Sequence, residues 1–332
     1  MSEDEFSVRP SVLVGETADT GLYRGVTILR NERINPTAVV EFVSNREGVV
    51  CGVREVKSLL LKILPEANRE VWALDDGLQM SNGEVVLRVK APYSSFGLYE
   101  TALCGILAQC SGWATASREC VKAAGGIPVI SNNGNRVHPN VAGIMDYSAI
   151  IGGCVSGTTS QGAKLSGTNA VGIISASVSL IMGGPVNAMR SLDQHTPQDV
   201  SRIAPVNVIN DENHEALDLA RVLGQKLRAV EVRETSSDWS ATLKLVRELR
   251  SRLDLDGYSH VEIFLSGSLT PQVIASLVSN QAPINAFQVT GYIGEASPIG
   301  FSATIHETDG KAKSIRGTIP GVTVNDRLAE II

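Results

Sequence analysis

The sequence of 332 residues lacks the motifs of several common protein classes. Its five cysteines form no C-x-x-C pair, and their odd number argues against a disulfide framework. Its five histidines show no H-x-x-x-H spacing, so no motif for a zinc site is present. We therefore expect the cysteines to be small buried hydrophobic residues, and we predict no metal-ligating residues.

An excess of basic charge is also missing. The chain has 29 basic and 35 acidic side chains, a net charge of −6, which gives no reason to expect nucleic acid or an anionic membrane as a partner. The most apolar stretch, AVGIISASVSLIMGG, is shorter than the ~20 apolar residues that a membrane-spanning helix needs. The amino terminus, MSEDEFSV, is acidic, unlike that of a signal peptide. These features predict a cytoplasmic globular protein with no nucleic-acid or membrane partner.

The apolar pattern predicts different structures along the chain. The first hundred residues contain two β-branched runs, TAVVEFVSN and GEVVLRVKA, and one segment with helical spacing, REVKSLLLKIL. A long helix is predicted over LYETALCGILAQCSGWATASRECVKAA, ended by Gly125 and Gly126. The tail, FSATIHETDGKAKSIRGTIPG, predicts a hairpin at Asp309-Gly310, a pair typical of a type I′ turn.

Short apolar strands alternate with helical or loop segments after the long helix. They are IPVIS, AIIGGCV, AVGIIS, IAPVNVI, RAVEVR, VEIFLSG and INAFQVT. Such alternation predicts parallel strands, and the absence of a G-x-G-x-x-G motif favours a closed or nearly closed barrel over an open sheet. We predict an irregular TIM-like α/β barrel over residues 105–290, inserted into a discontinuous α/β sandwich domain built from residues 1–104 and 291–332.

The segment NNGNRVHPNVAG, residues 132–143, follows the first predicted barrel strand. Chemistry in a barrel gathers where the strands end, so this segment is expected on the functional rim. Asn133-Gly134 indicates a turn, and Pro139 suits the first position of a helix. Arg136 and His138 would then lie in an anion-binding loop, although a histidine before a proline more often caps or packs than catalyses.

Six blocks of the sequence carry a likeness to a known family. They are GETAD (Gly15 to Asp19), YETALCGILAQCSGWATASRECVKAAGG, RVHPNVAGIMDYSAIIGGCV, NDENHEALDLARVLGQKL, LDLDGYSHVEIFLSGSL and IPGVTVNDRL. They cover nearly the whole chain and resemble the nicotinate phosphoribosyltransferase family. The resemblance implies a sandwich plus an irregular barrel, a dimer, and the formation of nicotinate mononucleotide from nicotinate and phosphoribosyl pyrophosphate. It also implies Mg²⁺ and, in many members, ATP; the residues themselves predict no cofactor.

The resemblance is weaker where the family does its chemistry. The family's FG-x-R loop, followed by HP, corresponds to NNGNRVHP, which places Asn135 at the arginine position. The family's R-L-D-T run corresponds to EVRE, so Glu231 stands for an arginine and Arg233 for an aspartate. In the family's V-D-T run, Asn207 replaces the carboxylate.

The family's phosphate cradle is altered as well. Its S-G-G run keeps Ser266 and Gly267 but gains a side chain at Ser268, and glycines there let backbone N–H groups approach a phosphate. Its F-G-V-G run becomes FQVT, which places Gln288 and Thr290 at two glycine positions. The resemblance therefore implies a pocket whose anion-binding groups have changed.

The candidate site residues follow from both lines of reasoning. Along RAVEVR, alternation puts Glu231 and Arg233 on one face, and a polar pair can face into a barrel only near its open rim. There a guanidinium would repel Mg²⁺ but could clamp a carboxylate or phosphate, with Glu231 holding it; an ion pair that merely fills the barrel is the alternative. The predicted catalytic residues are His138, Glu231 and Arg233. The predicted substrate-binding residues are Asn135, Arg136, Asn207, Glu234, Ser266, Gly267 and Ser268.

Three functions are compatible with this pattern. Phosphoribosyl transfer needs carboxylates near a cationic sugar and cations near the diphosphate, and losing one such group commonly costs ~10²–10³ in rate. The sequence therefore favours a repurposed enzyme acting on a pyridine carboxylate or nucleotide-like anionic small molecule in the old pocket. A catalytically silent paralogue serving as a partner or regulatory subunit ranks second, because decay would leave apolar rather than charged residues. An ordinary nicotinate phosphoribosyltransferase ranks third. As the resemblance implies, we expect a homodimer or higher homo-oligomer.

Overall fold

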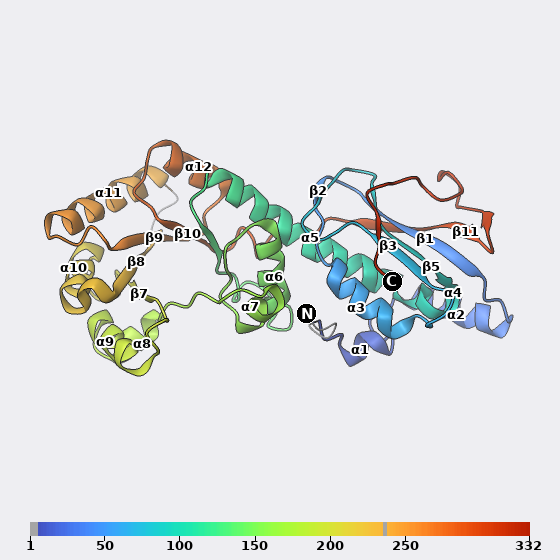
Figure 1. Cartoon of the computed structure of the whole chain (residues 1–332), viewed down its shortest axis with the longest axis horizontal. Coiled ribbons are helices and arrows are strands. Elements are labelled where there is room, and N and C mark those ends of the chain that lie inside the picture. Colours follow the sequence, from blue (N-terminus) through green and yellow to red (C-terminus); the bar gives the residue numbers. More distant parts are fainter. Residues whose placement is uncertain (1–5, 235–237) are drawn as a thin grey trace. The chain divides into compact units, whose positions relative to one another are not determined.

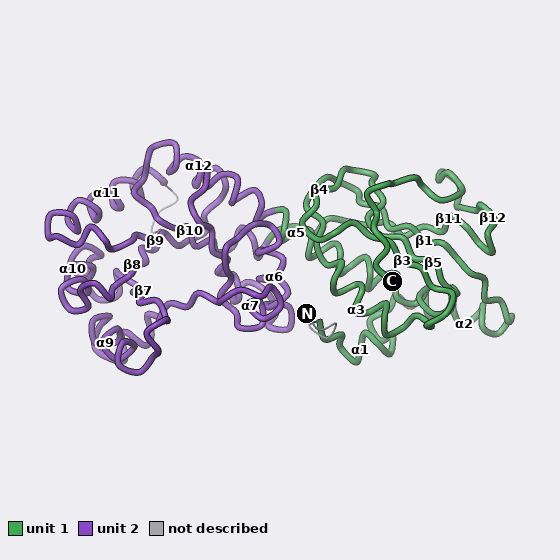
Figure 2. Tube along the Cα trace, viewed as in Figure 1, with its two compact units in different colours: residues 1–115, 296–332 green, residues 116–295 purple. Residues whose placement is uncertain are grey.

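A computed structural model describes residues 6–234 and 238–332. The chain forms two compact units (Figure 2): residues 1–115 with 296–332, and residues 116–295. The sequence placed the divisions after residues 104 and 290. The first division differs because it falls inside one uninterrupted helix, α5 (Glu100–Ala123), whose apolar pattern shows no break where the chain passes between the units.

The first unit is built on a mixed layer of helices and one antiparallel sheet. The sheet has the strand order β12-β11-β1-β5-β3-β13, so strands from both chain ends lie side by side (Figure 1). Its strands are β1 (Thr37–Ser44), β3 (Glu70–Ala73), β5 (Val85–Pro92), β11 (Phe301–Thr308), β12 (Lys311–Ala312) and β13 (Ala329–Glu330). A separate two-stranded sheet pairs β2 (Gly48–Val49) with β4 (Gln79–Met80).

The helices of the first unit bury their apolar stripes against the sheet. The core joins Phe42 and Leu87 of the sheet with Leu59 and Leu60 of α3 and Leu103 of α5, all with no exposed surface. The helices are α1 (Pro10–Leu13), α2 (Thr20–Asn31), α3 (Val53–Ile63), α4 (Tyr93–Phe96), the 3₁₀ helix η1 (Gly97–Tyr99) and the first part of α5. The predicted strands TAVVEFVSN and GEVVLRVKA and the predicted helix REVKSLLLKIL are confirmed.

The tail returns to this sheet through a tight hairpin. Asp309 and Gly310 have φ values of 48° and 70°, as the predicted type I′ turn between β11 and β12 requires. A buried carboxylate, Glu41, then fixes the chain beyond the hairpin. It accepts hydrogen bonds from Arg88 Nε at 2.8 Å and from the Thr323 backbone N–H at 3.1 Å. Glu41 Oε1 thus links Thr323 of the carboxyl-terminal segment to Arg88 of the sheet.

The second unit contains the barrel. Its five parallel strands have the order β6-β10-β9-β8-β7, and helices lie outside them (Figure 1). The strands are β6 (Val129–Ser131), β7 (Arg202–Pro205), β8 (Leu227–Arg233), β9 (Glu262–Gly267) and β10 (Ala286–Val289). The helices are the end of α5, α6 (Ala142–Gly152), α7 (Ser160–Ser166), α8 (Ala176–Ile181), α9 (Pro185–His195), α10 (Glu212–Leu223), η2 (Gly224–Lys226), α11 (Trp239–Leu255) and α12 (Pro271–Ser279). The predicted fold class, an irregular α/β barrel plus an α/β sandwich domain, is confirmed.

Two of the predicted barrel strands are wrong. AIIGGCV begins as the last turns of α6, which ends at Gly152 and is capped by Gly153 with φ 116°. The following residue, Ser156, forms an isolated bridge with Ile130. Helix α6 is buried nearly all round, so its apolar run has no helical period that would separate it from a buried strand. AVGIIS forms no strand; its first residues run beside the barrel, where the Val171 N–H donates to Gly157 O at 3.0 Å.

The barrel interior is apolar at its closed end. Inward side chains of the strands pack together there and contact Val171 and Ile173 of the irregular segment; they are Ile130, Ile203, Ala229, Phe264 and Ala286. Of the five cysteines, all are free thiols and four are buried, as predicted. In the described part of the chain, no helix is long and apolar enough to cross a membrane.

One half-buried carboxyl gives the first unit a predictable pH dependence. Burial raises the pKa of Glu55 to about 7, against a smaller lowering by Arg9. The folded protein therefore retains a proton that the unfolded chain releases, so stability falls as the pH rises from about 4.5 to about 7. We expect Glu55→Gln to be more stable than the wild type by about 1–3 kcal/mol at pH 8 and equal to it near pH 4.5, as measured by urea unfolding. The exposed Glu66→Gln variant is the control, and an identical pH response of both variants would contradict this assignment.

Candidate functional site

The inward positions of the strands change from apolar to polar towards the barrel's open end. On β8, Ala229 is followed by Glu231 and Arg233 at alternate positions. The same change occurs on β9 and β10, where Ser266 and Gln288 lie level with each other in the parallel register. The carboxyl ends of parallel strands meet at one edge, so these polar groups gather around one opening.

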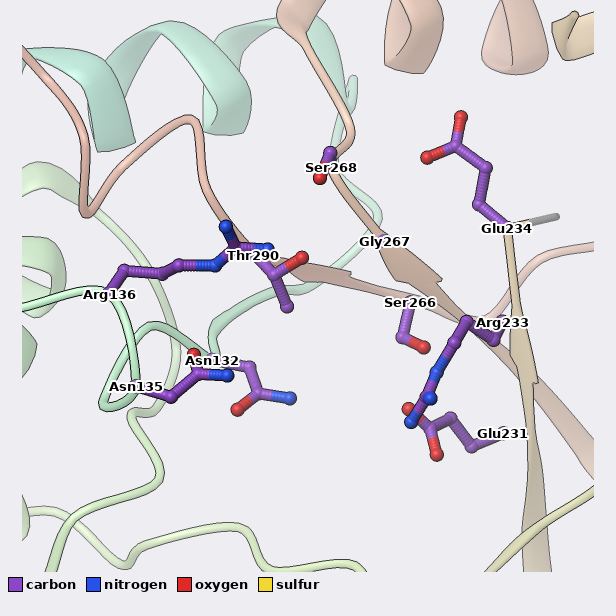
Figure 3. Close-up of a pocket in the computed structure, with 10 residues that line it drawn as sticks. All are labelled: Asn132, Asn135, Arg136, Glu231, Arg233, Glu234, Ser266, Gly267, Ser268 and Thr290. Carbon is purple, nitrogen blue, oxygen red and sulfur yellow. The ribbon is translucent and has the colours of Figure 1, made fainter. Parts of the chain in front are cut away.

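A cavity of about 350 Å³ occupies this opening (Figure 3). Its size falls within the ~300–1,000 Å³ range of small-molecule sites. We call it the mouth cavity. It is lined by Asn132, Asn135, Arg136, Glu231, Arg233, Glu234, Ser266, Gly267, Ser268 and Thr290. Eight of the ten predicted site residues are therefore brought together, although their roles stay predictions.

Arg233 and Glu231 form one wall of the mouth cavity. Both side chains extend from β8 beside Ser266 (Figure 3). Glu231 is 7% exposed, whereas Arg233 is exposed at the opening. Within residues 6–234 and 238–332, no carboxylate lies at ion-pair distance from the Arg233 guanidinium. Arg233 therefore lines the cavity without a fixed salt bridge among the described residues.

Glu234 and Gly267 pack closely at the end of the same wall. A Cβ atom on Gly267 would lie 2.6 Å from Glu234 Cβ, so this approach requires glycine. Burial raises the pKa of Glu234, while a hydrogen bond from the Ser268 backbone N–H opposes the rise. In Figure 3 the Glu234 carboxylate points away from Glu231. Of the predicted titratable stretch EVRETSSDW, residues 235–237 lie outside the described part of the chain, and Asp238 caps α11 through the Ser240 N–H at 2.9 Å.

The opposite wall is the loop after β6. Arg136 forms an ion pair with Glu295 at 3.0 Å, and its side chain lies across the cavity from Arg233 (Figure 3). Asn133 holds this loop through side-chain hydrogen bonds. Its Oδ1 accepts the N–H groups of Gly291 at 2.7 Å and Gly294 at 3.2 Å, and its Nδ2 donates to Val289 O at 2.9 Å. Asn133 therefore holds the loops after β6 and β10 together, a role that its turn signal did not predict.

His138 and Asn207 line neither this cavity nor its neighbour, contrary to the sites predicted for them. His138 is exposed, and its Nδ1 accepts the Asn140 backbone N–H at 3.2 Å, so it caps a turn. The following helix begins at Ala142 rather than at Pro139, because Pro139 and Asn140 belong to that turn. Asn207 is exposed and adopts a left-handed conformation with φ 64°, which turns the chain after β7.

A second cavity of about 250 Å³ lies against the same polar groups. We call it the deep cavity. It shares Asn132, Glu231 and Arg233 with the mouth cavity and adds Gln288 and residues of the irregular segment, together with Thr158 and Pro205. Gln288 and Thr290 could have been predicted as site residues by extending the inward alternation of INAFQVT. Asn132 could not, because it follows the strand in an irregular turn.

A buried aspartate positions the loop that carries Thr158. Asp146 Oδ2 accepts the backbone N–H groups of Thr158 at 3.1 Å and Thr159 at 2.8 Å. A Cβ atom on Gly157 would lie only 2.4 Å from the Asp146 carboxyl carbon. Asp146 thus sets the path of the loop 157–159 next to the barrel, and nothing in its helical sequence context signalled this role.

The described residues contain no group of three histidine, cysteine, aspartate or glutamate side chains that could bind a divalent ion by themselves. The two carboxylates of the mouth cavity, Glu231 and Glu234, point in different directions (Figure 3). The Mg²⁺ that the family resemblance implied would therefore need other ligands, such as phosphate oxygens of a substrate, beside one of these carboxylates.

Two sequence profiles of one family match the chain. The profile described as the quinolinate phosphoribosyl transferase N-terminal domain matches residues 23–111, and that of the C-terminal domain matches residues 113–303. The chain belongs to the quinolinate phosphoribosyltransferase family. This confirms the resemblance at the level of the type II phosphoribosyltransferases, which include the quinolinate and nicotinate enzymes.

Solved and curated relatives agree with this family. The nicotinate-nucleotide pyrophosphorylase of Pyrococcus furiosus is 34% identical, with a TM-score of 0.85 over 97% of this chain and 82% of that one. Human nicotinic acid phosphoribosyltransferase is 15% identical, with a TM-score of 0.66 over 91% of this chain and 77% of that one, and so shares the fold. A nicotinate phosphoribosyltransferase of Mycobacterium tuberculosis is 26% identical over 221 residues, which are 66% of this chain. The match spans 47% of that curated relative's length.

The loop contacts of Asn133 predict a measurable loss of stability in this member of the family. Asn133→Ala removes three hydrogen bonds to the backbone and leaves buried N–H and C=O groups unpaired, each of which costs about 1–3 kcal/mol. We expect a total loss of at least about 3 kcal/mol in urea unfolding. Asn135→Ala is the matched control, because Asn135 is exposed in the same loop. Equal stability of the two variants would show that Asn133 does not hold the loop.

Proposed function

We propose that the mouth cavity binds an anionic small molecule through Arg233, and that this family member acts on a ligand other than the ordinary pair of nicotinate and phosphoribosyl pyrophosphate. The observation that carries the proposal is the open guanidinium of Arg233 in a cavity at the barrel rim. A guanidinium presents several N–H donors in a planar fork that suits carboxylate and phosphate oxygens. The hydroxyls of Ser266, Ser268 and Thr290 line the same space and add donors for such oxygens.

The positions of charge support a changed reaction. A sugar cation in phosphoribosyl transfer is stabilised by nearby carboxylates, whereas Arg233 is the residue that stands on β8 where the family pattern has an aspartate. Glu231, the nearest carboxylate, stands where the pattern has an arginine and is almost buried. If the resemblance assigns these positions correctly, both signs are inverted on one strand, and a cation would stand near the developing positive charge. The same inversion gives the cavity a donor for a bound anion.

Arg233→Ala tests the anion site. With a panel of nicotinate, nicotinate mononucleotide, phosphoribosyl pyrophosphate and inorganic pyrophosphate, we expect at least one anion to raise the unfolding temperature of the wild type, because a ligand of the folded state stabilises it. Arg233→Ala should lose this rise while keeping its own unfolding temperature, since an unpaired exposed side chain contributes little to stability. The measurement is a thermal-shift titration at fixed ionic strength.

The control is Arg190→Ala, an exposed arginine on α9 away from both cavities, which should retain the full shift. A wild-type response that survives in Arg233→Ala would place the anion elsewhere. Loss of the response in both variants would mean that net charge, rather than this site, determines binding.

The proposal also predicts a weak ordinary activity. With nicotinate and phosphoribosyl pyrophosphate, we expect turnover far below ~10 s⁻¹, the median for enzymes, because two charges of the reaction are inverted and other groups are replaced by neutral ones. Formation of nicotinate mononucleotide, followed by chromatography with and without ATP, measures it. A turnover within tenfold of that median would contradict the proposal and identify an ordinary member of the family.

A further inference from the structure

The deep cavity differs in character from the mouth cavity. Apart from the shared pair Glu231 and Arg233, every residue that lines it is uncharged. Its lining combines aliphatic surface with amide and hydroxyl groups, contributed by Asn132, Thr158, Val171, Gly172, Ile173, Ile174, Ser175, Ala176, Pro205 and Gln288. Glu231 and Arg233 contribute one negative and one positive charge at the junction, and the rest of the lining adds none. The deep cavity therefore suits a neutral group.

Gln288 lines this cavity and carries a buried amide oxygen without a hydrogen-bond partner among the described residues. It lies on β10 in register with Ile130 on one side and Ser266 on the other, both facing the barrel interior. Its side chain is 2% exposed, and Oε1 has no hydrogen-bond partner within the described residues. A buried carbonyl oxygen without a donor is rare and unfavourable in proteins. Rotation of the amide presents either an acceptor or a donor, so its natural complement is a group that carries both.

The irregular segment forms a second set of unpaired amides. The N–H and C=O groups of Gly172, Ile173 and Ile174 form no hydrogen bond with any residue that the structure describes. All three residues line the deep cavity. Backbone N–H and C=O groups without a partner in the fold are available to hydrogen-bond a ligand. This observation is independent of Gln288 and points to the same chemistry.

We propose that the deep cavity receives a neutral, flat group of the carboxamide or lactam type, whose attached phosphate or carboxylate is bound by Arg233 in the mouth cavity. Gln288 is the residue that sets this preference, by hydrogen bonding to the neutral group. The proposal rests on the proposed function for its anionic end. It adds the chemical class of the ligand's second end, which the charge of Arg233 does not determine.

Two probes that differ at one group test the preference. Nicotinamide mononucleotide carries a carboxamide and nicotinate mononucleotide a carboxylate, on the same ring and phosphate. By isothermal titration calorimetry we expect the wild type to bind the carboxamide at least tenfold more tightly, because a polar site discriminates strongly against a group that leaves it unpaired. In Gln288→Leu the ratio of the two Kd values should fall to near one. Gln272→Leu, on the outside of the barrel, should keep the wild-type ratio.

The unliganded protein provides a second readout. If Gln288 serves ligand binding rather than folding, Gln288→Leu should unfold at the same temperature as the wild type or at a higher one. The substitution removes a buried amide oxygen that has no hydrogen-bond partner among the described residues. A clearly lower unfolding temperature would show that Gln288 serves the fold, and it would overturn the proposal. Equal or tighter binding of nicotinate mononucleotide by the wild type would overturn it too.

These outcomes separate the two proposals. Binding that depends on Arg233 but does not distinguish the two mononucleotides removes the inference about the deep cavity and leaves the anion site standing. Failure of every anion, including both mononucleotides, to bind the wild type removes the proposed function and the inference together.

Discussion

The site depends on one constraint, which is that the inside of a small barrel holds polar side chains only where its strands open. Below that level, Ile130, Ile203 and Phe264 fill the interior and exclude water. Two residues further along the strands, the same inward alternation brings Glu231, Ser266 and Gln288 to the interior. A charge at the lower level would be desolvated without a partner, whereas at the rim a cavity satisfies it. The position of the chemistry is thus a consequence of strand length and the two-residue period.

The loops at the rim keep their conformation because two buried residues hydrogen-bond to their backbone. Asn133 bonds three backbone groups of the loops after β6 and β10, and Asp146 fixes the loop that carries Thr158. Neither residue touches the mouth cavity. Each replaces strand hydrogen bonds at points where the parallel sheet has ended, and so each lets irregular backbone keep a defined path. Because Asn133 and Asp146 hold the neighbouring loops, the backbone amides that line the deep cavity need no partner within the fold.

Much of the architecture could be predicted from the sequence, because strands such as RAVEVR and VEIFLSG are short, β-branched and regularly spaced. The same alternation predicted that Glu231 and Arg233 share a face. The failures have physical causes. AIIGGCV and AVGIIS are apolar without a clear period, so a buried helix end and an irregular wall resemble strands. His138 belongs to a turn whose capping bond cannot be read from residue types, and Asn207 lies two residues after β7 in a left-handed conformation. Gln288, by contrast, was within reach of the alternation rule.

The central claim is that the open guanidinium of Arg233 is the anion site of this barrel. Crystals soaked in tungstate test it most directly, because the anomalous signal of tungsten locates a phosphate-like tetrahedral anion without ambiguity. The account predicts an anomalous peak in the mouth cavity, with tungstate oxygens within hydrogen-bond distance of Arg233 and of the hydroxyl of Ser266 or Ser268. A cavity without a peak, with Arg233 folded onto Glu231 as a closed ion pair, would contradict it.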